Sequence, residues 1–147
     1  MRYTLRLSLA GFTHTAMSDE FPPPSPAPLR ALVVDDDDTM LEFVAGVLRR
    51  AGYDVQTCSD GMAALELFRA RPFDVAVVDV RMPKLSGLSF LKNLRLPQNS
   101  PHRIVLFSSM IDKKLEREAL DAGAAACLPK PASARAILDA VSPPARA

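Results

Sequence analysis

Cysteine is scarce in this sequence, and only Cys58 and Cys127 occur among its 147 residues. Two isolated cysteines in apolar or neutral surroundings cannot form the disulfide framework of a small secreted domain, so a reducing, cytoplasmic setting is expected. No stretch approaches the roughly 18 consecutive apolar residues that a transmembrane helix needs. Arg6 also interrupts the apolar residues of positions 1–16 before a signal-peptide core can form. We therefore expect neither secretion nor membrane insertion.

The sequence also has no large excess of positive or of negative charge. The chain carries 18 Lys and Arg residues against 17 Asp and Glu residues, which gives a formal net charge of +1. No helix-turn-helix or basic helix is visible, and both facts argue against direct nucleic-acid binding. The chain has 48% hydrophobic and 24% charged residues, a composition that fits one globular domain with a sizeable core.

Proline is concentrated near the N-terminus, in the segment FPPPSPAP of residues 21–28. Such a density disfavours helices and strands and favours extended polyproline geometry. Residues 1–29 are therefore expected to be a disordered, proline-rich tail without chemistry, and Met17 is an alternative to Met1 as the start of translation. The folded domain is expected to span residues 30–142, followed by a C-terminal tail of residues 143–147.

From Arg30 onward, short apolar runs alternate with helical periodicity. This pattern is typical of strand–helix units around a parallel sheet. Five apolar runs are candidate strands, at residues 31–34, 53–57, 73–78, 104–107 and 124–128. The second of these runs alternates apolar and polar residues, which favours an edge strand. The sequence thus predicts an α/β fold of three layers, in which five strand–helix units form a doubly wound parallel sheet.

Helix signals follow each predicted strand. Thr39 and Glu42 fit a capping box for the first helix, and Asp37 and Asp38 are expected to be capping, solvated acids at its start. The second helix is expected from about Asp60 to the residue before Pro72. Ser133 fits the N-cap of the fifth helix. Apolar stripes mark the third and fourth helices, with Leu88, Leu91 and Leu94 in the third and Ile111, Leu115, Ala119 and Ala122 in the fourth.

Acids, hydroxyls and a lysine follow the predicted strands. The first strand ends in Asp35 and Asp36, the third in Asp79, the fourth in Ser108 and the fifth in Lys130. The carboxyl ends of parallel strands meet at one sheet edge, where carboxylates repel one another unless a divalent cation lies among them. Mg²⁺ usually binds only one or two protein carboxylates, so its other coordination positions are available to phosphate oxygens. An ammonium group and a hydroxyl group stabilise the charge of a phosphoryl group during its transfer. The strand ends therefore predict magnesium-dependent phosphoryl chemistry.

Several motifs at these strand ends resemble the response-regulator receiver family of bacterial two-component systems, the CheY-like superfamily. The matching motifs are LVVDD at 32–36, VVDVRMP at 77–83, Gly87, Ser108-Ser109 and Lys130-Pro131. The resemblance extends from Arg30 to about Val141. It implies a flavodoxin-like sheet of strand order 2-1-3-4-5 and a cis peptide bond between Lys130 and Pro131.

The resemblance also implies roles for single residues. Asp79 would accept a phosphoryl group from a histidine kinase or a phosphotransfer protein, while Ser108 and Lys130 contact the phosphoryl oxygens. The residues implied as Mg²⁺ ligands are Asp35, Asp36, Asp79 and, through its backbone carbonyl, Arg81. Among these, Asp35 would act through water or a weaker contact.

The expected function is that of a single-domain response regulator, a phosphoacceptor signalling domain and not a classical enzyme. No output domain is visible in the remaining residues. The signal is therefore expected to pass to a separate effector protein through the fourth helix, the fifth strand and the fifth helix. A shuttle in a phosphorelay is equally compatible, and the oligomeric state is expected to be a monomer or a phosphorylation-dependent dimer.

Two alternative functions remain open. Cys127 stands where many family members carry a Tyr or Phe that moves inward on activation. Together with the proline-rich tail, it motivates the second hypothesis, a phosphorylation-independent interaction module or pseudo-receiver. A haloacid-dehalogenase-like hydrolase, the third, would need an acid two residues beyond Asp79, where Arg81 stands. Met110 lies two residues beyond Ser108, and its bulk is expected to slow the attack of water on an acyl phosphate.

Overall fold

A computed structural model describes residues 26–97 and 99–142 of the chain. Strands and helices alternate along the chain, and the strands form one parallel sheet in the order β2-β1-β3-β4-β5. The elements are β1 (Arg30–Val34), α2 (Asp38–Arg50), β2 (Asp54–Cys58), α3 (Gly61–Ala70), β3 (Val75–Asp79), α4 (Gly87–Leu94), β4 (Arg103–Ser108), α5 (Lys113–Asp121), β5 (Ala126–Pro129) and α6 (Ala134–Val141). The predicted flavodoxin-like fold and strand order are confirmed, as is the edge position of β2.

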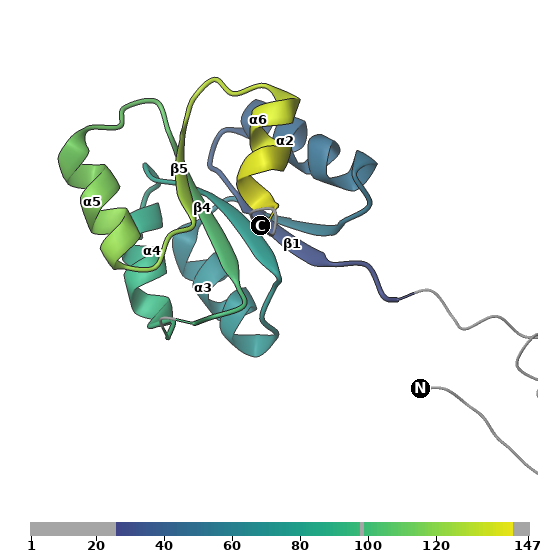
Figure 1. Ribbon diagram of the computed structural model, residues 1–147, viewed down its shortest axis with the longest axis horizontal. Coiled ribbons are helices and arrows are strands. Elements are labelled where there is room, and N and C mark those ends of the chain that lie inside the picture. The colour runs from purple at the N-terminus through teal and green to yellow at the C-terminus, as the bar shows by residue number, and fades with distance from the viewer. Residues whose placement is uncertain (1–25, 98, 143–147) are drawn as a thin grey trace, which may run out of the picture.

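Helices cover both faces of the sheet, which gives three layers (Figure 1). α2 and α6 pack on one face around a cluster that includes Val33, Val44 and Ile137, and α3, α4 and α5 pack on the other around Leu32 and Phe90. Neighbouring residues of β1 serve opposite clusters because successive side chains of a strand point to opposite faces. The central strands are buried on both sides, so they appear in the sequence as continuous apolar runs.

The register of the sheet aligns the carboxyl ends of four strands. Val34 of β1 pairs with Val78 of β3, so the next residues, Asp35 and Asp79, leave the sheet at the same level. Asp79 is itself opposite Phe107 of β4, and the next residue of β4, Ser108, lies opposite Pro129, the residue before Lys130. Parallel pairing therefore brings the polar residues of four separate segments to one edge.

Two predicted helix starts are wrong. The N-cap of α2 is Asp37, whose carboxylate accepts from the N–H groups of Thr39 and Met40, so the predicted capping box at Thr39 does not form. A charged carboxylate is the better acceptor at the positive end of a helix, and it starts α2 earlier. α5 begins at Lys113 after the N-cap Asp112, which leaves Ile111 outside the helix. The N-caps Asp60 and Ser133 agree with the sequence signals.

Some apolar residues predicted to lie in strands are buried outside them, and one predicted helix stripe lacks a buried residue. The third strand begins at Val75, and Phe73 lies fully buried just before it. The fifth strand begins at Ala126, because the Ala124 N–H closes the end of α5 by donating to Ala119. In α4 the buried side chains include Phe90, which the predicted leucine stripe missed. Apolar runs mark burial, and burial extends beyond the hydrogen-bonded elements.

The predictions for the terminal tails cannot be compared with the structure over residues 1–25 and 143–147, because these residues lie outside the described ranges. Across residues 26–97 and 99–142, none of the helices combines the length and the apolar character that a bilayer crossing demands.

Gly87 should tolerate no side chain, because a Cβ atom there would collide with the backbone carbonyl of Asp79. Gly87→Ala is expected to lower the free energy of unfolding by about 2 kcal/mol. Gly46→Ala is the matched control: its Cβ would make ordinary contact with the Arg50 side chain, and removing a glycine from a helix interior should stabilise by about 0.5–1 kcal/mol. Urea unfolding of both variants measures the difference, and equal effects would contradict the close approach of Gly87 to Asp79.

Candidate functional site

Three carboxylates meet at the carboxyl edge of the sheet. Asp35 follows β1 directly and Asp79 is the last residue of β3; both are buried, whereas Asp36 is exposed. One oxygen of each of the three carboxylates lies within 4.8 Å of the others. Carboxylate oxygens at this spacing match the ligand chemistry of a hard divalent cation such as Mg²⁺. The cluster contains all three acids that the strand-end pattern singled out.

Lys130 supplies positive charge to this cluster. Its ammonium nitrogen lies 2.9 Å from Oδ2 of Asp35 and 3.4 Å from Oδ1 of Asp79. Burial works against the charge of this lysine, but the hydrogen bond and the charge of Asp35, together with Asp79, outweigh it and raise the pKa of Lys130. The peptide bond from Lys130 to Pro131 is cis, as the resemblance implies. The lysine is therefore a fixed cation between two buried acids.

Asp79 has an unusual electrostatic environment for a carboxylate. Burial raises its pKa, and the charge of Asp35 adds to this effect. Lys130 and the backbone N–H of Arg81, which donates to Asp79 Oδ1 at 3.3 Å, lower it only in part. The net result is a pKa of about 6. A group that is charged at neutral pH against such a penalty gains from any cation that binds beside it.

The hydroxyl of Ser108 lies at the same edge but is held by its own loop. Ser108 is buried, and its Oγ donates to the Met110 carbonyl at 3.0 Å while accepting from the Met110 N–H at 3.1 Å. The hydroxyl is thus engaged with backbone and not with Asp79. Contact between Ser108 and a phosphoryl oxygen on Asp79 requires exchange of these local bonds.

Arg81 and Met110 connect the loops on the two sides of Asp79. Nη2 of Arg81 donates to the sulfur of Met110 across 3.5 Å. Arg81 comes from the loop after β3 and Met110 from the loop after β4. The Met110 side chain is 65% exposed. The Met110 side chain is therefore tied to Arg81, two residues beyond Asp79, and is not packed into the core.

The sequence reasoning missed three supporting contacts. The backbone N–H of Asp37 donates to Asp35 Oδ1 at 2.9 Å, so the acidic run after β1 orients its own first carboxylate. The ammonium of Lys130 lies 5.3 Å from the ring centroid of Phe107, an aromatic support for its charge. Lys84 in the loop after β3 pairs with Asp60 at 3.4 Å. Only the acidic run gave a signal in the sequence, because the other contacts join distant segments.

Cys127 occupies the middle of β5, opposite Leu106 of β4. Its side chain is half-buried and packs against the cluster under α3, α4 and α5. Burial, together with the charge of Glu116, raises the pKa of its thiol. Cys127 is thus a small, protonated, largely apolar side chain at this position.

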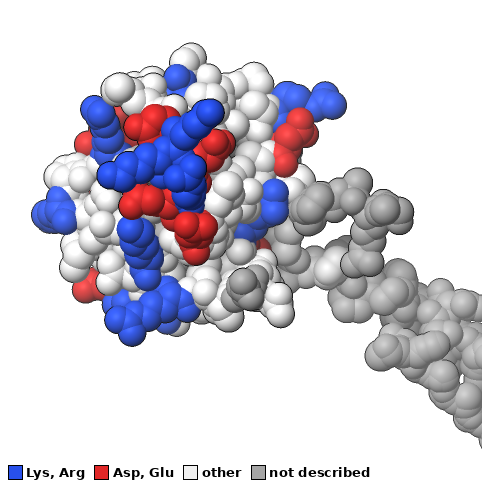
Figure 2. Space-filling view, turned by 60° about the vertical axis from the view of Figure 1, so that its left-hand side comes forward, with Lys and Arg blue, Asp and Glu red and all other residues white. Residues whose placement is uncertain are grey.

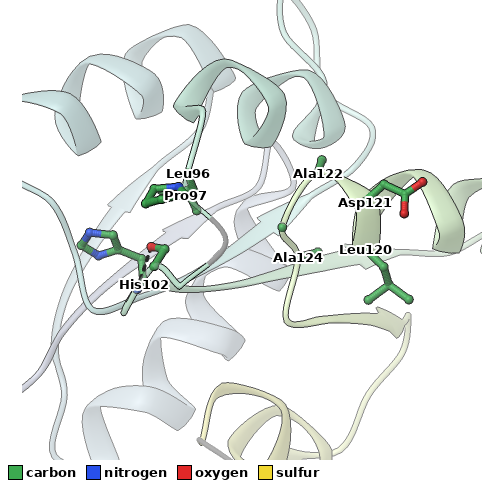
Figure 3. A pocket seen from close by; sticks show the side chains of 9 residues that line it. Leu96, Pro97, His102, Leu120, Asp121, Ala122 and Ala124 are labelled. Carbon is green, nitrogen blue, oxygen red and sulfur yellow. Dashed lines mark hydrogen bonds between the residues drawn. The ribbon is translucent and has the colours of Figure 1, made fainter.

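One hollow in the described surface lies away from the acids. It is lined by residues that precede β4 and β5, among them Leu96, His102 and Ala124, and so belongs to the opposite edge of the sheet (Figure 3). Nδ1 of His102 lies 2.7 Å from the Phe73 carbonyl, and its ring packs edge-on against Phe68. His102 is therefore held by structural contacts.

Known proteins are similar to this chain in sequence and in fold. The response regulator MprA of Mycobacterium sp. strain KMS is 40% identical over 124 residues, which cover 79% of this chain and 53% of MprA. The signal receiver domain of the putative response regulator NarL from Mycobacterium tuberculosis has 34% identity and a TM-score of 0.70, with 79% of this chain and 94% of that chain covered.

A third similar protein has been solved in a phosphorylated state. It is a response regulator protein from Burkholderia pseudomallei with a phosphorylated aspartic acid, calcium ion and citrate, 30% identical with a TM-score of 0.69, covering 78% of this chain and 66% of that one. The chain spans about half the length of MprA and of other curated relatives. The family model of the response regulator receiver domain matches residues 31–142. The chain therefore belongs to the response regulator receiver domains of two-component signalling.

Proposed function

We propose that the domain of residues 30–142 accepts a phosphoryl group on Asp79 from a histidine kinase or a phosphotransfer protein, and that phosphorylation controls binding of an effector protein. The observation that carries the proposal is the buried, electrostatically destabilised carboxylate of Asp79 beside Lys130 and two further acids. The phosphorylated aspartic acid named for the Burkholderia pseudomallei protein supports the same chemistry here. The proposed role is that of a single-domain response regulator, with which a shuttle in a phosphorelay is equally compatible.

Magnesium is the proposed cofactor, since receiver domains typically use Mg²⁺ at an acidic pocket. The carboxylates of Asp36 and Asp79 and the backbone carbonyl of Arg81 would hold the ion, with Asp35 contributing through water or a weaker contact. The three acids fit this role because their oxygens already lie within 4.8 Å of one another. When bound, Mg²⁺ neutralises charge on the acids and on the phosphoryl oxygens.

The transfer itself would use the chain's own groups as follows. A carboxylate oxygen of Asp79 attacks phosphorus, a new O–P bond forms, and the bond from phosphorus to the donor nitrogen or oxygen breaks as the donor leaves with its electron pair. Lys130, now placed between Asp35 and Asp79, would shift toward the negative phosphoryl oxygens. Ser108 would exchange its bonds with Met110 for a phosphoryl oxygen. These movements link the chemistry to the loop after β4.

The signal would leave through α5, β5 and α6, the fourth helix, fifth strand and fifth helix of the sequence-based prediction. Figure 2 shows basic and acidic side chains intermixed on the side of the molecule that includes α5. The charged residues of α5 are Lys113, Lys114, Glu116, Arg117, Glu118 and Asp121. A surface of mixed sign suits a protein partner better than a nucleic-acid backbone. Response regulators act between histidine kinases and downstream effectors. For this chain we propose that these interactions take place in the cytoplasm.

Two alternatives have less support from the residues. A phosphorylation-independent module would not need the cluster of acids around Lys130, although Cys127 in place of an aromatic switch residue motivates it. Arg81 still lies where a dehalogenase-like hydrolase would need its second acid.

Phosphorylation is tested by incubating the protein with acetyl phosphate and Mg²⁺ and weighing it by mass spectrometry. One phosphoryl group should be added to the wild type and none to Asp79→Asn, since the amide cannot form an acyl phosphate. Asp38→Asn is the matched control because this acid lies at the start of α2, outside the three-acid cluster, and it should be phosphorylated like the wild type. A wild type that gains no phosphoryl group would favour the pseudo-receiver. Rapid, repeated hydrolysis of acetyl phosphate would favour the hydrolase.

Asp79 should also make stability depend on pH and Mg²⁺. Its raised pKa means that the folded state binds the proton more tightly than the unfolded chain, so stability falls as pH rises from about 4 to about 6. Without Mg²⁺, Asp79→Asn should therefore be more stable than wild type at pH 7, by on the order of 2 kcal/mol, and nearly equal to it at pH 4. Urea unfolding across this range measures both proteins.

Adding Mg²⁺ at pH 7 should stabilise the wild type and have less effect on Asp79→Asn, because the cation binds the folded acidic cluster. Asp38→Asn should respond to Mg²⁺ as the wild type does. An Asp79→Asn variant that is no more stable than wild type at pH 7 would argue against the buried charge described for Asp79.

Met110 is expected to shield the acyl phosphate from water. Met110→Ala removes the side chain that contacts Arg81 beside Asp79, so the half-life of phosphorylated Asp79 should fall severalfold. The half-life is followed by mass spectrometry after removal of acetyl phosphate. Met62→Ala, which also removes an exposed methionine, serves as the control, and equal half-lives of wild type and Met110→Ala would remove the idea.

A further inference from the structure

The methionines of the described residues share one location. Met40 and Met62 lie in the first turns of α2 and α3, Met82 in the loop after β3, and Met110 in the loop after β4. All four are therefore at the carboxyl edge of the sheet, around the acidic cluster. Met110 is the most exposed of them, at 65% against 46% for Met62, while Met40 and Met82 are half-buried. Exposure makes the Met110 thioether the most accessible to a solute.

Met110 also occupies a position between groups of the site. Its sulfur accepts from Arg81 Nη2 at 3.5 Å, and its backbone holds the Ser108 hydroxyl through two hydrogen bonds. The backbone N–H of Arg81 in turn donates to Asp79. A change at the sulfur of Met110 therefore acts on a chain of contacts that reaches the Asp79 carboxylate through Arg81 and, in the loop after β4, the Ser108 hydroxyl.

We propose that Met110 is a site of sulfoxidation by peroxides, such as hydrogen peroxide or an organic hydroperoxide, and that its sulfoxide closes the Arg81 bridge more tightly. In this step a sulfur lone pair attacks one peroxide oxygen, an S–O bond forms and the O–O bond breaks. The thioether is oxidised by two electrons to the sulfoxide. The oxygen bound to sulfur releases its proton to solvent, the departing oxygen takes up a proton, and the peroxide is thereby reduced to water or an alcohol.

The neighbourhood of Met110 favours this reaction. Negative charge develops on the departing peroxide oxygen, and the guanidinium of Arg81 lies beside the sulfur to stabilise it. The competing thiols are less available: Cys58 is only partly exposed and donates its hydrogen to the Asp60 carbonyl, and Cys127 is half-buried. Peroxides attack exposed thiolates, which shielded cysteines supply poorly.

The sulfoxide would change the strength of the bridge. A thioether sulfur is a weak acceptor, whereas a sulfoxide oxygen carries substantial negative charge and would form a charge-assisted hydrogen bond with Arg81. The loops after β3 and β4 would then be tied together beside Asp79. This consequence rests on the proposed phosphoacceptor role of Asp79. In phosphorylation the leaving group of the donor, and in hydrolysis the attacking water, lies on the side of phosphorus opposite the Asp79 oxygen, so the tie should slow both reactions.

The test compares the protein before and after mild hydrogen peroxide treatment, followed by removal of the oxidant. Peptide mass spectrometry should locate the first sulfoxide at Met110, ahead of Met62. Phosphorylation by acetyl phosphate and hydrolysis of the acyl phosphate should both slow by about threefold, the size of effect that one modest hydrogen bond supplies. A methionine sulfoxide reductase with its thiol reductant should restore both rates.

Three variants separate Met110 from other oxidisable groups. In Met110→Leu the rates should not respond to peroxide, while Met62→Leu should respond as the wild type does. Met110→Gln offers an amide oxygen to Arg81 without oxidation, so its rates should be slow from the start and unaffected by peroxide. An equal response of Met110→Leu and wild type, or a first sulfoxide at Met62, would overturn the proposal.

Hydrogen exchange tests the bridge without any phosphorylation. Backbone amides of residues 80–86 and 108–112 should exchange more slowly in the oxidised wild type than in the reduced protein, and Met110→Leu should show no such change. If the protein accepts no phosphoryl group at all, the proposed function is contradicted. The hydrogen exchange data and the location of the first sulfoxide then still test the proposal for Met110. Unchanged exchange with Met110 fully oxidised would rule out a tighter bridge.

Discussion

The crowding of two buried carboxylates around one lysine is the constraint on which the rest of this structure depends. Asp35 and Asp79 leave neighbouring strands at the same level, and Lys130 contacts both. One ammonium cannot offset the burial and mutual repulsion of both acids, and the pKa of Asp79 stays raised, near 6. The site is consequently short of positive charge. A divalent cation supplies that charge, and phosphorylation of Asp79 then exchanges a carboxylate for a group that the same cation and lysine can hold.

Much of this arrangement could be predicted from the sequence, because it follows from periodicity and strand order. The buried strands are continuous apolar runs, and the first polar residue after each run had to fall at the carboxyl edge, which is how Asp35, Asp79 and Lys130 were found together. The helix starts were less predictable. Asp37 and Thr39 both fit an N-cap, and only the three-dimensional path of the chain after Asp35 decides that Asp37 caps α2.

Contacts between loops could not be predicted at all. Lys84 and Asp60, or Arg81 and Met110, come from different strand–helix units, and nothing in their local sequence indicates that they meet. Such pairs depend on where each loop lies above the sheet edge, which is set by the packing of α3, α4 and α5. Ser108 shows the same limit: its position at a strand end was predictable, but its attachment to the Met110 backbone was not.

The sheet divides the interior into two separate clusters, one under α2 and α6 and the other under α3, α4 and α5. β1, β3 and β4 contribute to both clusters, but no helix side chain crosses from one cluster to the other. A displacement of α4 or α5 therefore disturbs packing on one side only, while α2 and α6 keep their own contacts with the opposite face. The described part of the molecule thus consists of two separately packed halves on either side of the sheet, and the acidic edge belongs to the sheet that both halves share.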